Sequence, residues 1–70
     1  PTTNDVIVQS SEQLGTISHI HVLNAAGESL WTSQPNQLRA TVSMRDWTTG
    51  PYYFTVSIQD HQFVRQVVKQ

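Results

Sequence analysis

The chain has 70 residues, no cysteine, four basic residues against five acidic ones and a formal net charge of −1. This length allows one domain, near the lower limit at which packing alone stabilises a core. The composition excludes a disulfide framework, a thiolate metal site and the basic surface that nucleic-acid binding requires. No apolar run approaches the roughly 20 residues that span a bilayer. Because the chain opens on Pro1 rather than methionine, we expect residues 1–70 to be a single domain excised from a longer protein.

The first half of the chain contains three expected strands, at residues 5–9, 16–24 and 28–32. The second and third are separated by the sequence NAAG, in which Gly27 can take the positive φ that a hairpin corner demands. A second turn is expected at Gln34-Pro35-Asn36, because proline sets φ for a turn.

Alternation of apolar and polar residues is clearest at residues 38–44 and 52–58. One face of the first segment carries Leu38, Ala40, Val42 and Met44, and one face of the second carries Tyr52, Phe54, Val56 and Ile58. This period of two predicts half-buried antiparallel strands.

The last expected strand covers residues 62–69 and follows a turn at Asp60-His61. Its apolar residues come in adjacent pairs that fall on both faces, which predicts a bulge or burial on both sides. No segment has the spacing of a stable helix. The sequence therefore predicts an all-β fold, a small immunoglobulin-like antiparallel β-sandwich of six or seven strands.

Histidine is the one residue type that raises the question of a metal. His19 and His21 share a strand face about 7 Å apart, a spacing that suits zinc or copper if a third ligand such as His61 lies near. The commoner alternative is two half-exposed histidines opposite the inner face that carries Ile20 and Val22. We predict no metal and no cofactor.

Catalytic patterns are missing from the sequence. The carboxylates are scattered and no nucleophile motif accompanies the histidines, so we expect that the chain is not an enzyme. Trp31, Trp47, Tyr52 and Tyr53 would form a sugar-stacking platform if exposed, which makes a carbohydrate-binding or adhesive module one alternative; a structural spacer of a surface protein is another. Large rings usually fill the core of so small a domain, so we expect Tyr52 in the core, Trp47 as a plug beside it and only Tyr53 outward.

Four motifs follow one another in a characteristic order. The chain opens with PTTNDVIV, continues with IHVLNAAG at residues 20–27 and VSMRDWTTGPY at 42–52, and ends with VVKQ at 67–70. In this order the whole chain resembles the C-terminal sorting domain of the type IX secretion system of Bacteroidetes-type bacteria.

The resemblance implies a domain that passes through the periplasm with its parent protein and is recognised by outer-membrane components of the secretion machinery. Export to the outer-membrane surface and attachment there follow, commonly with cleavage by a sortase-like enzyme. The residues that match the motifs are Asn24, Gly27, Gly50, Tyr52, Arg65, Val67, Val68 and Lys69.

The sequence also raises two structural expectations for the motif residues. Gly50 should form a tight corner where a side chain would clash, so that Tyr52 drops inward beside Trp47. The final strand should present an open edge with few charges, so we expect a possible homodimer through the C-terminal strand.

Overall fold

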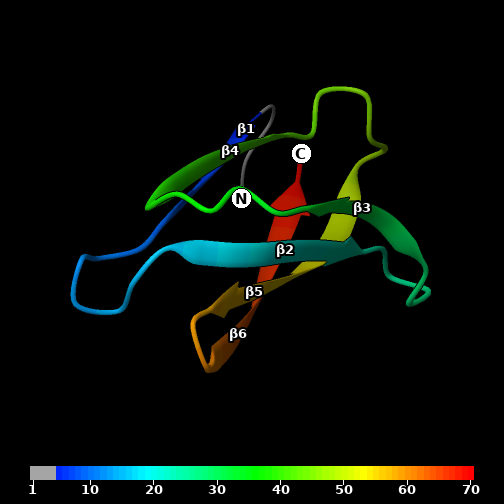
Figure 1. Cartoon of the computed structure of the whole chain (residues 1–70). Coiled ribbons are helices and arrows are strands. Elements are labelled where there is room, and N and C mark those ends of the chain that lie inside the picture. Colours follow the sequence, from blue (N-terminus) through cyan, green and yellow to red (C-terminus); the bar gives the residue numbers. More distant parts are fainter. Residues whose placement is uncertain (1–4) are drawn as a thin grey trace.

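The computed structural model describes residues 5–70, and every regular element in that range is a strand. The first four residues of the family-like opening lie outside the described residues. The strands are β1 (Asp5–Gln9), β2 (Ile17–Leu23), β3 (Ser29–Ser33), β4 (Arg39–Ser43), β5 (Gly50–Ile58) and β6 (His61–Lys69). All six coincide with expected strands to within two residues at each end, and Figure 1 shows their course.

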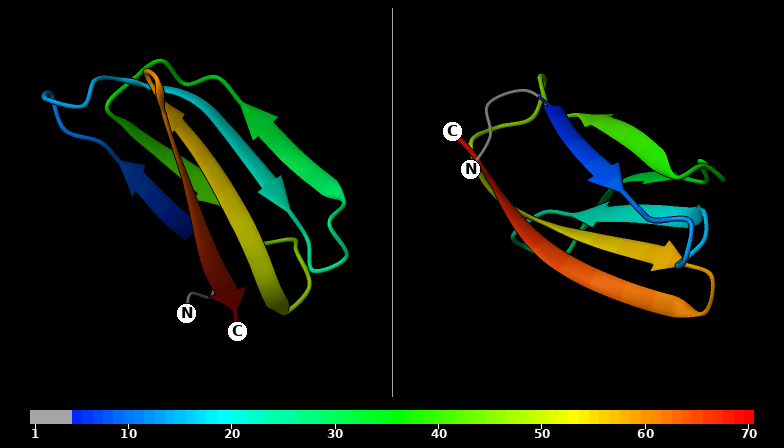
Figure 2. Two further views of the ribbon diagram at one scale, coloured as in Figure 1. Left: turned by 90° about the horizontal axis from the view of Figure 1, so that it is seen from below. Right: turned by 90° about the vertical axis from the view of Figure 1, so that its left-hand side faces the viewer.

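The strands form two antiparallel sheets that pack face to face (Figure 2). The larger sheet has the order β3-β2-β5-β6, and the smaller one consists of β1 and β4. Two sheets joined in this way bury the inner face of each. The predicted all-β sandwich is therefore confirmed, with six strands.

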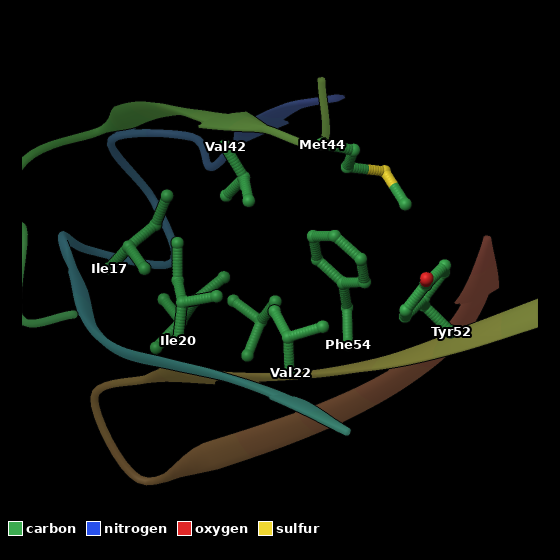
Figure 3. Packing of buried hydrophobic residues seen from close by; sticks show 9 residues of the cluster. Ile17, Ile20, Val22, Val42, Met44, Tyr52 and Phe54 are labelled. Atoms are coloured by element: carbon green, nitrogen blue, oxygen red, sulfur yellow. The ribbon is translucent and has the colours of Figure 1, made fainter. Parts of the chain in front are cut away.

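The core lies between the sheets, as Figure 3 shows, with side chains of β4 and its following loop above those of β2 and β5. Val42 and Met44 come from one side and Phe54 from the other, and each is at most 1% exposed. The alternation predicted for 52–58 is confirmed, because its four inward residues are all buried while Tyr53 lies on the outer face, half-buried.

One core residue breaks the simple alternation. Ile17 and Ile20 are both fully buried although three positions separate them. The pairing of β2 with β5 shifts register between Ile17 and His19, which is where a bulge reverses the side-chain parity. Ser18 bridges the irregularity, since its hydroxyl donates to the Ser57 carbonyl at 3.0 Å.

The last strand differs from the expectation of a bulge or two-sided burial, which was wrong. β6 pairs with β5 without a register shift from His61 to Lys69. The apolar residues on its outer face are exposed to solvent instead of buried, Val64 by 59% and Val68 by 40%. In the part of the chain that the structure describes, no other strand packs on the outer face of the larger sheet, so these side chains stay exposed.

The turn before β6 lies one residue earlier than predicted. The two-residue connection is Gln59-Asp60, and His61 already pairs with Ile58. Gln59 has φ 55°, a conformation that glycine usually supplies. Its side chain packs against Gly15, where an added Cβ would lie 2.6 Å from the Gln59 Cγ.

Within residues 5–70 there is no helix long and apolar enough to cross a membrane.

Candidate functional site

The β2–β3 hairpin is organised by Asn24. Its side-chain Oδ1 accepts hydrogen bonds from the backbone N–H of Ala26 at 2.9 Å and of Glu28 at 3.0 Å. Its own carbonyl accepts from the N–H of Gly27, which has φ 86°. An asparagine that bonds the backbone two residues later is a standard turn former, and the positive φ suits glycine. These two motif residues therefore act locally to shape the loop.

The start of β5 is organised by Tyr52. Its hydroxyl donates to the Thr48 carbonyl at 2.6 Å, and its ring lies 5.1 Å from the Trp47 ring, tilted by 41°. Tyr52 is 4% exposed. The expectation that Tyr52 drops inward beside Trp47 is confirmed, and tilted packing at this distance is favourable for aromatic pairs.

Gly50 needs a different explanation from the one its sequence position suggested. Apart from Gly50 and its two chain neighbours, no residue has an atom within 4 Å of the position that a Cβ would take, so the expected clash is absent. The backbone is the constraint, because φ is 137°, in a region that residues with an L side chain rarely adopt.

The end of β6 reaches across to the loop before β5. Lys69 pairs with Gly50, and its ammonium donates to the carbonyl of Arg45 at 3.0 Å and to that of Trp47. Sequence reasoning missed this contact, since its acceptors are backbone carbonyls that no side-chain pattern marks. Lys69 is therefore a latch that holds the loop of residues 44–47 against the end of the sheet.

Seven of the eight motif residues come together at one end of the larger sheet. We call this the motif end, and it consists of Asn24, Gly27, Gly50, Tyr52, Val67, Val68 and Lys69. The strand register brings them together, because Leu23 pairs with Tyr53 while Tyr52 pairs with Val67. A shallow pocket of about 280 Å³ opens here, lined by residues 24–26 and 48–52.

Arg65 is the motif residue that lies apart. It pairs with Phe54 in the middle of β6 and lines a second pocket of about 230 Å³ between β1 and β6. The other lining residues are mostly apolar: Val8, Gln9, Leu14, Val56, Ile58 and Phe63.

The histidines occupy separate places. The rings of His19 and His21 lie 6.2 Å apart on the outer face of β2, and His21 Nε2 is 2.8 Å from the Ser29 hydroxyl. His61 stands at the start of β6, where it contacts the ring of Phe63. Among residues 5–70, no three histidine, cysteine or carboxylate side chains gather as a metal site.

The aromatic rings do not form a flat exposed platform in the part of the chain described. The one pair among Trp31, Trp47, Tyr52 and Tyr53 is Trp47 with Tyr52, and it is tilted and turned toward the core. Trp31 is also half-buried and packs on the core. This arrangement disfavours the sugar-stacking alternative.

Comparison with known proteins identifies the family. The model of the secretion system C-terminal sorting domain matches residues 1–70, which is the whole chain. Comparison of the chain with curated proteins and with solved structures found no match. The four ordered motifs, the small β-sandwich and the match along the full length agree, and the chain belongs to the family of type IX secretion system C-terminal sorting domains.

Proposed function

We propose that this domain is the signal by which its parent protein is exported across the outer membrane and attached to the cell surface. The observation that carries the proposal is the gathering of seven motif residues at the motif end of a domain that belongs to the sorting family. These residues are far apart in sequence, so a folded domain is required to present them together. A folded shape is the feature that the secretion machinery reads.

The residues of the motif end have two kinds of role in this proposal. Asn24, Gly27, Gly50 and Tyr52 hold the loops in place through backbone conformation and internal hydrogen bonds. Val68, which is 40% exposed, and the shallow pocket form the surface that is presented. Recognition through shape needs no reacting group, which fits a non-catalytic role.

The partners we propose are outer-membrane components of the type IX machinery and a sortase-like enzyme that joins the parent to the surface. The route leads through the periplasm to the outer-membrane surface. The domain spans residues 1–70 and belongs at the C-terminal end of a longer parent. Self-association through β6 in the isolated domain is a further part of the proposal, because no strand of the described residues 5–70 pairs with its outer edge.

Deletion of residues 65–70 from the full-length parent tests the export function. We expect the truncated parent to accumulate in the periplasm, since the deletion removes the latch, three of the seven residues of the motif end and part of β6. Fractionation and surface labelling measure its location. Thr41→Ala is the matched control, because Thr41 is exposed on β4 in the other sheet.

Deletion also disturbs the fold, so a point variant is needed beside it. Val68→Glu changes an exposed side chain on the outer face and leaves the core intact. We expect this variant to fold with normal stability and to be exported poorly. Normal surface delivery of both the deletion and the Val68 variant would refute the proposed function.

A further inference from the structure

The last strand has one side without a partner. β6 pairs with β5 along its whole length, and no strand of residues 5–70 lies on its other side (Figure 2). The two-residue turn makes Ile58 and His61 the closing pair, and a closing pair exchanges backbone hydrogen bonds. Alternate residues of β6 therefore bond to β5, and those between them direct their N–H and C=O outward: Gln62, Val64, Gln66 and Val68.

This edge has only one of the usual protections against another strand, the inward-pointing charge of Arg65. Natural edges are guarded by proline, bulges, short length or inward-pointing charge. β6 has nine residues, no proline and an unbroken register. β6 carries two full charges. Lys69 is engaged with backbone carbonyls, so Arg65 is the charge that remains to repel or attract another strand.

Side chains beside the edge have a definite pattern. Residues opposite each other in an antiparallel pair share a face, so the partners of the buried β5 residues point to the inner side. On β6 this row reads Phe63, Arg65, Val67. Phe63 is 37% exposed and borders the apolar pocket together with Arg65, whereas Val67 packs on the core. The side chain of Arg65 has no hydrogen bond or ion pair with any of residues 5–70.

We propose that the protein that reads this signal adds an extended strand of its own to the free edge of β6. The added strand has an acidic residue opposite Arg65 and apolar residues two positions to either side, opposite Phe63 and Val67. Its backbone bonds to the outward groups of β6, while the inward side chains cover the pocket between β1 and β6 and pair with the guanidinium. The inference rests on the proposed function and gives Arg65, which lies away from the motif end, a role in it.

A second copy of the chain is a poorer occupant of the same edge. If two β6 strands pair antiparallel along their full length, each Arg65 stands opposite its counterpart in the other copy, and directly opposed like charges are destabilising. Sliding the strands avoids this contact but shortens the ladder. The charge pattern therefore favours a strand of different sequence.

Gln66→Pro in the full-length parent tests the backbone contact, with Gln66→Ala as its matched control. Proline is tolerated on an edge where the N–H faces solvent, so the domain keeps its fold. Both variants remove the glutamine side chain and its weak hydrogen bond to the Tyr53 hydroxyl at 3.4 Å. Only proline also removes the outward-directed backbone N–H of position 66. We expect surface delivery to fall about tenfold for proline and to stay normal for alanine.

Arg65→Glu and Arg65→Lys form a second pair that does not disturb the fold, because the Arg65 side chain is exposed. We expect charge reversal to block export and lysine to preserve most of it. Normal export of Gln66→Pro, equal loss in Gln66→Ala, or normal export of Arg65→Glu would each overturn strand addition. A Gln66→Pro variant that loses only self-association would assign the edge to a second copy instead. Failure of the proposed function would look different from failure of strand addition, because the parent that lacks residues 65–70 would then also reach the surface.

Discussion

Replacement of Gly50 by alanine tests why glycine stands at the start of β5. The position has φ 137° and open space around a would-be Cβ, so the cost is entirely one of backbone conformation. Forcing an L residue into a rarely adopted region costs about 1–3 kcal/mol, and the stiffer unfolded chain of alanine returns about 0.4–1 kcal/mol. The net loss of unfolding free energy should be about 1–2 kcal/mol.

Chemical denaturation of the isolated domain measures this loss directly, and thermal unfolding should show Tm falling by about 5–15 °C, given about 4–8 °C per kcal/mol for a domain of this size. Gly50→Val should cost about the same or somewhat more, because the Cβ position is open and a β-branched side chain is stiffer than that of alanine.

D-alanine at position 50 is the decisive control. A D residue prefers positive φ, so it should leave the domain at least as stable as glycine does. A loss under about 0.5 kcal/mol for L-alanine, or equal losses for both alanine enantiomers, would refute the conformational explanation.

Three further outcomes are expected for the isolated domain. Tyr52→Phe should lower the unfolding free energy by about 1 kcal/mol in urea, because the Thr48 carbonyl loses its donor; an unchanged midpoint would contradict this. Lys69→Met should cost about 1 kcal/mol and speed amide exchange at Trp47, whereas Lys69→Arg should restore most of the loss; equal exchange in both would show that the latch is not needed. Light scattering over a concentration series should show weak dimers through β6, with slower amide exchange at Val64 and Gln66; a strict monomer at millimolar concentration would exclude self-association.

The sequence predicts the inner face of β5 correctly because alternation depends only on the local period of a strand. Alternation does not predict the burial of Ile17, because the bulge at Ser18 that buries this residue arises from pairing with β5. The positive φ of Gln59 could not be predicted either, because the β5–β6 register places the turn at this residue although the sequence offers no glycine there.

The candidate site shows the same division between local and long-range information. The roles of Asn24 and Gly27 in a turn can be read from four adjacent residues. Their nearness to Gly50 and Lys69 requires the strand order β2-β5-β6, which no single segment encodes. The contact of Lys69 with the Arg45 carbonyl depends on that order as well.

The position of β6 at the margin of the sheet has a consequence for dynamics. This strand is joined to the domain by one ladder, by the packing of Val67 and by the Lys69 latch, whereas β2 and β5 each pair with a strand on both sides. Segments with few buried contacts open at lower free energy than the whole domain. We therefore expect β6 to open locally at a lower free energy than β2 and β5, while Phe54 and the strands around it stay folded.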